Sequence, residues 1–238
     1  MIRKIVYVTL LVLGMSVWQS CSDDEVVNVA PSQTGTMQDK EGNQYKWVRL
    51  GSLDWMAENL RCGTPFYEQT TLSSYGRVQS LVSFGLLEEV QQYQKDFGNY
   101  YTYQEALDNC PDGWRLPTDD DWKNLERTLG MSAKNTDAEG WRDGAGLLMI
   151  QTAEQGTGLA LRYGGELCKW GYGNATDKVV KPYRQYEFGM YWTSTIDTRR
   201  SDESVWYRKI MSGKNQVERR STATFAHHLC VRYVRDAN

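Results

Sequence analysis

The sequence predicts a domain of the α+β class, in which short helices and strands occupy separate stretches of the chain. Capping-box patterns mark two helices in the middle of the chain, at residues 102–109 and 118–129. Aromatic and β-branched residues mark strands on either side of them, at residues 45–50 and 191–195. Beyond residue 140 glycines recur at short intervals, which is typical of short strands joined by loops.

The first elements are a strand and a helical segment. Residues 45–50 follow a turn at residues 41–43 and form the first predicted strand. In residues 74–97 apolar side chains recur close to helical spacing, although Gly85 argues against one continuous helix.

The two central helices have the clearest start signals. Thr102 with Glu105 begins the first, and Thr118 begins the second, with acidic residues 119–121 in its first turn. Gly130 is a natural residue just past its end. Its apolar face comprises Trp122, Leu125 and Leu129.

Three strands complete the prediction. They cover residues 191–195, 205–210 and 229–234. In the last strand Leu229, Val231 and Tyr233 share one face by alternation.

The composition fits one folded domain. The chain has 238 residues, of which 40% are hydrophobic, and its nine Trp and fifteen Tyr need packing partners, which excludes disorder for most of it. A net charge of −3 argues against nucleic-acid binding driven by bulk charge. A mean hydropathy of −0.61 excludes a multi-span membrane protein.

Residues 1–20 have the order of a secretory signal. Arg3 and Lys4 precede an apolar stretch at residues 5–17, which is too short to span a bilayer comfortably. Cys21 follows Ser20, and this arrangement resembles the lipid-bearing cysteine of bacterial lipoproteins. We expect a lipid on Cys21; the alternatives are an ordinary cleaved signal or an N-terminal membrane anchor.

Residues 21–38 are predicted to be an acidic, polar tether, and residues 39–238 the domain. Residues 22–25, Ser-Asp-Asp-Glu, resemble the acidic export tag of surface lipoproteins of the Bacteroidetes type. A solvated acidic linker is the alternative. The expected location is the outer membrane, lipid-anchored and surface-exposed.

Six short motifs together resemble one bacterial family. They are LDWMAENL at 53–60, FGNYYTYQEA at 97–106, CPDGWRLPT at 110–118, GLAL at 158–161 with Gly164-Gly165, YWTST at 191–195 and VRYVRD at 231–236. The chain resembles the Fibrobacter succinogenes major paralogous domain family, which occurs in secreted and lipid-anchored bacterial proteins. The family has a Cys where this chain has Tyr233, and residues 62–96 and 166–189 look like elaborations.

The resemblance implies a C-type lectin-like fold, which sulfatase-modifying enzymes also resemble. In this fold two helices flank a small twisted antiparallel sheet with a long loop region, and the N- and C-terminal strands pair. The resemblance also implies a Cys110–Cys230 disulfide, leaving Cys62 and Cys168 as a second pair. Four free buried thiols are the alternative.

The sequence offers little for catalysis or metal binding. It has no CxxC, no phosphate-binding glycine loop and no G-x-S-x-G elbow. His227 and His228 are adjacent, so on a strand they face opposite sides and cannot chelate one ion together. Only Cys230 lies past residue 168, so the thiol pair of a sulfatase-modifying enzyme is absent. We expect no metal, no cofactor and no enzymatic activity.

Aromatic residues in glycine-rich segments are the predicted ligand contacts, because aromatic faces beside arginines stack on sugars or hold a protein partner. The alternative is that they cover a small loop core. The predicted residues are Trp141, Trp170, Tyr172, Tyr183, Arg184 and Tyr186, all within a variable region at residues 140–190.

The predicted function is a lipid-anchored, non-catalytic cell-surface module that binds a glycan or a protein. A structural component of a surface assembly is the second hypothesis, and an enzyme the third.

Overall fold

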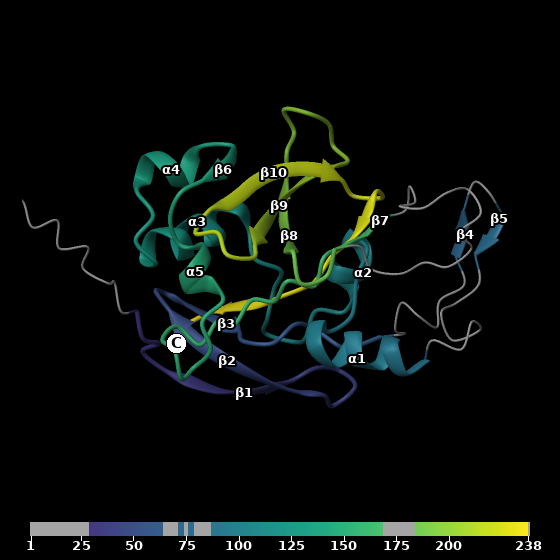
Figure 1. The fold of residues 1–238 in the computed structure, drawn as a ribbon, viewed down its shortest axis with the longest axis horizontal. Helices are drawn as coiled ribbons and strands as arrows, with labels where there is room; N and C mark the ends of the chain where they lie inside the picture. Colours follow the sequence, from purple (N-terminus) through teal and green to yellow (C-terminus); the bar gives the residue numbers. More distant parts are fainter. Residues whose placement is uncertain (1–28, 64–70, 74–75, 79–86, 169–183, 238) are drawn as a thin grey trace, which may run out of the picture.

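The computed structural model describes residues 29–63, 71–73, 76–78, 87–168 and 184–237. Within these residues the fold is α+β, as predicted, with two four-stranded antiparallel sheets and five helices (Figure 1). Four-stranded sheets of this kind need another layer to bury one face. The two sheets provide that layer for each other, together with the helices.

The first sheet joins both ends of the domain. Its strands are β1 (Thr34–Gln38), β2 (Gln44–Leu50), β3 (Leu53–Met56) and β12 (Val234–Asp236), in the order β1-β2-β3-β12. The C-terminal strand therefore does join the N-terminal strands, and its direct partner is β3.

β1 lies inside the segment that was expected to be tether. Met37 is buried, and the indole of Trp47 packs so closely on Gly35 that an added Cβ would lie 2.5 Å from the ring. The domain therefore begins at Thr34 or earlier, because this strand is held by side-chain packing as well as by its pairing with β2.

The second sheet contains two of the predicted strands, those expected at residues 191–195 and 205–210. Its strands are β8 (Phe188–Ile196), β9 (Ser204–Met211), β10 (Val217–Ala223) and β6 (Gly140–Arg142), in the order β6-β10-β9-β8. Two short strand pairs form separate two-stranded sheets, β7 (Leu167–Cys168) with β11 (His227–His228) and β4 (Thr71–Ser73) with β5 (Gly76–Val78).

The two central helices form as predicted. They are α2 (Tyr103–Asp108) and α3 (Asp119–Thr128), and each has a complete capping box, at Thr102 and Thr118. The other helices in the described residues are α1 (Leu87–Phe97), α4 (Ala133–Asp137) and α5 (Gly146–Met149).

One predicted element was wrong, and another differs in part. Residues 76–78, inside the segment with helical spacing, pair with residues 71–73 as a hairpin, and the helix that the structure describes there, α1, covers Leu87–Phe97. The strand expected over residues 229–234 is irregular until Val234. Leu229 bonds Tyr101, Cys230 bonds Met190 and Val231 bonds Leu60, so no single partner strand supports a continuous ladder.

The core has two clusters. The first contains Trp55 and Trp122, whose rings meet edge to face at 5.0 Å, and the second contains Trp192. Trp114 is only partly buried against the second cluster. Leu229, Val231 and Tyr233 all belong to the second cluster, so their predicted common face is confirmed although the strand is not.

Candidate functional site

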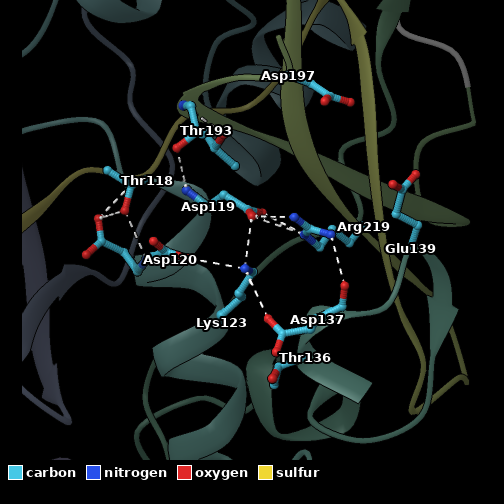
Figure 2. A network of polar contacts seen from close by, with 12 residues as sticks. Thr118, Asp119, Asp120, Lys123, Thr136, Asp137, Glu139, Thr193, Asp197 and Arg219 are labelled. Atoms are coloured by element: carbon cyan, nitrogen blue, oxygen red, sulfur yellow. Dashed lines mark hydrogen bonds and ion pairs between the residues drawn. The ribbon is translucent and has the colours of Figure 1, made fainter. Parts of the chain in front are cut away.

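The densest group of charges lies between α3 and the inner face of the second sheet, the face that carries Tyr191 and Ile210. Asp119 of α3 accepts hydrogen bonds from Arg219 at 2.6 Å, as Figure 2 shows, and from Arg208 at 2.7 Å. Burial alone would raise the pKa of Asp119, but the two arginines lower it to about 2. The carboxylate is therefore charged at neutral pH and holds α3 to the sheet.

Glu126, about two turns further along α3, completes this network. It accepts from Arg142 at 2.7 and 2.8 Å and from Arg208 at 2.7 Å, and all three side chains are essentially inaccessible. Lys123 extends the network to Asp120 and Asp137, as Figure 2 shows. Because these charged groups pair with one another, the network has a structural role and holds α3 against the second sheet.

The opposite face of the sheet presents a different arrangement. Register places Trp141 of β6 beside Glu218 of β10, and Glu218 beside Lys209 of β9, so these side chains form one row across three strands. Tyr207 and Arg220 form the neighbouring row. We call these five residues the Trp141 patch.

The polar groups of the Trp141 patch are held in place. The Glu218 carboxylate is buried, pairs with Arg220 at 3.0 Å and accepts from the Tyr207 hydroxyl at 3.4 Å. Burial, together with the Glu218 charge, raises the pKa of Tyr207 above its usual value. Tyr207 is therefore a neutral donor at any physiological pH.

Trp141 is the exposed aromatic member of the patch, with 39% of its surface accessible, and Arg220 is exposed beside it. An exposed indole beside fixed donors and acceptors can cover the apolar face of a ligand while the polar groups orient it. Sequence reasoning selected Trp141 but missed its partners. The alternation in residues 204–211 could have placed Tyr207 and Lys209 on one face.

The other predicted contacts do not join this patch. Arg184 and Tyr186 precede β8, at the opposite edge of the sheet from β6. Three strand spacings separate these edges, or about 14 Å. Tyr186 is 61% exposed, but its ring meets Phe97 edge to face and its hydroxyl donates to Asp96 at 3.3 Å. Trp170, Tyr172, Tyr183 and Cys21 lie outside the described residues.

Much of the region at residues 140–190 is interior. Ala145, Met149, Leu159, Leu161 and Leu167 belong to the first core cluster. Among the aromatic side chains that the structure describes in this region, Trp141 and Tyr186 are the exposed ones.

A separate groove lies at one end of the first sheet. It has a volume of about 410 Å³ and opens between the β1–β2 turn, residues 61–63 and α1. No local sequence motif predicts this groove, because it is formed by three segments that are distant in the sequence. Its polar side chains are Glu41, Asn43, Arg61, Gln91, Gln94 and Lys95.

A model of the Fibrobacter succinogenes major domain matches residues 48–235. The chain belongs to this family. The match covers both four-stranded sheets apart from β1, the first four residues of β2 and the last residue of β12, so the predicted resemblance is confirmed. No curated protein and no solved structure matches the chain.

Three of the cysteines in this Fibrobacter succinogenes major domain are free thiols, so the expected Cys110–Cys230 disulfide is not formed. Cys230 is buried in the first core cluster, whereas Cys110 packs against the second and donates to the Trp114 carbonyl at 3.1 Å. Cys62 is free as well, which excludes the second expected bridge, with Cys168, in this structure.

The thiols of the Fibrobacter succinogenes major domain are weakly acidic. Burial raises the pKa of Cys110 to about 11 and that of Cys230 to about 12. Both are therefore protonated at neutral pH and are poor nucleophiles.

Within the described parts of the chain, no group of three or more His, Cys, Asp or Glu side chains could hold a metal ion. None of the helices described is long and apolar enough to cross a membrane.

Proposed function

We propose that this protein is a lipid-anchored, surface-exposed, non-catalytic binding module of C-type lectin-like fold, and that it binds a glycan through the Trp141 patch. Cys21 would carry the lipid, and the outer membrane would be its location. The observation that carries the binding proposal is the exposed indole of Trp141, aligned across the sheet with a buried carboxylate and an ammonium group.

The chemistry of the patch favours a sugar. A pyranose ring has an apolar face of C–H groups, which packs on an indole, and a rim of hydroxyls that donate and accept. Arg220 and Lys209 supply donors at the rim of the patch. Glu218 and Tyr207 are fixed by their own contacts, so little ordering is needed on binding.

A structural role would favour a broad apolar surface instead. The large apolar side chains that are exposed in the described residues come from five separate segments, namely Leu107, Trp141, Leu147, Tyr186 and Phe225. No described element carries more than one of them, which does not favour a broad apolar assembly face.

The test is a glycan-binding screen of the mature protein from residue 22, with and without calcium. Trp141→Ala should weaken binding at least tenfold. Leu147→Ala is the matched control, because Leu147 is equally exposed on α5 and is not part of the patch. Binding that Trp141→Ala leaves intact would contradict the proposed site. If a folded sample binds no glycan of the panel, the result would favour a protein partner or a structural role instead.

A further inference from the structure

The groove at the β1–β2 turn has the properties of a second ligand site, distinct from the Trp141 patch. It lies at the end of the first sheet where β1 turns into β2. The first described residues join the sheet at the other end, where Ser32 bonds Arg49. In Figure 1 the end of the sheet with the β1–β2 turn lies on the right, beside α1, and the C-terminus lies on the left. β2 separates the two ends by about 20 Å.

The lining of the groove limits what can bind. Apart from Gly63, every residue of the lining has a polar side chain, so an apolar ligand would find no partner. Of its charges, Arg61 already pairs with Glu58 at 2.9 Å, which leaves Glu41 and Lys95 to balance each other. The groove is thus close to neutral, and a strongly anionic or cationic ligand gains little there.

One wall of the groove is rigid. The guanidinium of Arg61 lies 4.4 Å from the centre of the Tyr45 ring and donates to the Gln44 carbonyl at 2.7 Å. The Glu41 carboxylate accepts from the backbone N–H of Gly63 at 3.1 Å. A wall fixed in this way loses little side-chain entropy when a ligand binds.

The other wall is the face of α1 that carries Gln91, Gln94 and Lys95, which follow helical spacing. Among the residues that the structure describes, none bonds the side chain of Gln91 or Lys95. The hydrogen-bonding groups of these two side chains therefore line an open groove and remain available to a ligand.

We propose that this groove binds a neutral saccharide. Sugar hydroxyls both donate and accept, and so do the amides of Asn43, Gln91 and Gln94, whereas Lys95 only donates and Glu41 only accepts. The volume of about 410 Å³ is at the lower end of the range for ligand sites, roughly 300–1,000 Å³, and suits one or two sugar rings. The site goes beyond the proposed function, because it binds independently of Trp141.

The experiment measures binding of the mature full-length domain to neutral oligosaccharides and to uronate-containing ones, by calorimetry. The double variant Gln91→Ala, Lys95→Ala should lose at least tenfold in affinity for a neutral ligand. Gln92→Ala is the matched control on the same helix, because Gln92 bonds Asp96 and does not line the groove. Circular dichroism verifies folding, which these exposed positions should not disturb.

The outcomes separate the two sites. Loss in the double variant, with Gln92→Ala and Trp141→Ala unchanged, supports the groove. Loss only in Trp141→Ala overturns the groove and leaves the proposed function standing. A preference for uronate-containing ligands that the double variant abolishes also overturns it, because a neutral groove does not predict that selectivity.

Discussion

Arg232 holds together three of the sequence motifs that identify the family. Its guanidinium is fully buried and donates to the side chain of Asn59 and to the carbonyls of Met56, Leu159 and Ala160. No carboxylate is among these partners. Burial therefore lowers the pKa of Arg232 to about 10, and neutral acceptors alone satisfy the charge.

We predict that Arg232→Met destabilises the domain by at least about 3 kcal/mol, because four buried acceptors lose their donor at about 1–3 kcal/mol each, partly offset by removal of a buried charge. The measurement is the free energy of unfolding in urea. Arg200→Met, at an exposed arginine, should change it by less than about 1 kcal/mol. Equal effects of the two variants would show that the buried contacts carry no stability.

Single residues were harder to place from sequence than their neighbourhoods. Trp141, a predicted ligand contact, and Arg142 are adjacent in the sequence. On β6 they face opposite sides, so Trp141 is exposed while Arg142 is buried against Glu126. The sequence does not reveal which side is interior, because Glu126 lies 16 residues away on a helix.

At the scale of elements, α3 is fixed to the second sheet by Asp119, whose pKa of about 2 lies below its usual 3.8. Between these two pH values the unfolded chain binds more protons than the folded one, so stability rises with pH there. The contribution of Asp119 is therefore complete above about pH 4 and is lost as the pH falls towards 2.

We predict that wild-type protein loses roughly 2 kcal/mol through Asp119 between pH 4 and pH 2. Asp119→Asn should be less stable at neutral pH and should lose that part of the slope. Asp120→Asn is the control, because Asp120 is adjacent, exposed and paired only with Lys123. Denaturant unfolding at a series of pH values measures both, and parallel curves for wild type and Asp119→Asn would contradict the assignment.

The helices were the most predictable elements because their start signals are local. Thr102 and Thr118 cap α2 and α3 from within four residues of sequence. The groove beside α1 was not predictable, because Glu41, Arg61 and Lys95 come from three segments that only the folded chain brings together. The disulfide prediction failed for the same reason, since it depended on which core cluster each cysteine would join.

At the scale of the whole molecule, both ends of the described chain lie at one end of the first sheet. Ser32 bonds Arg49 there, and Ala237 bonds Ser52 in the adjoining turn. A lipid on Cys21 would hold this end near the membrane. The groove at the β1–β2 turn would then face away from the membrane, where a soluble or surface-bound saccharide can reach it.

This orientation requires a lipid anchor on Cys21, and a substitution at Cys21 tests for that anchor. Two or more acyl chains on Cys21 would make membrane attachment stable, and a serine in its place would not receive them. We expect wild-type protein in the membrane fraction and Cys21→Ser in the soluble fraction or the medium. Cys110→Ser is the matched control, because that thiol is internal and its loss should leave the protein in the membrane fraction.

Protease treatment of intact cells tests on which side of the outer membrane the domain lies. A surface-exposed domain is digested, whereas one that faces the periplasm is protected. If Cys21→Ser stays in the membrane fraction, residues 5–17 act as an uncleaved anchor and the lipid is unnecessary. If it leaves the membrane while the wild-type domain resists protease, the lipid is present but the domain faces inward. The acidic residues 22–25 then serve only as a solvated linker, and the groove can bind only saccharides that reach the periplasm.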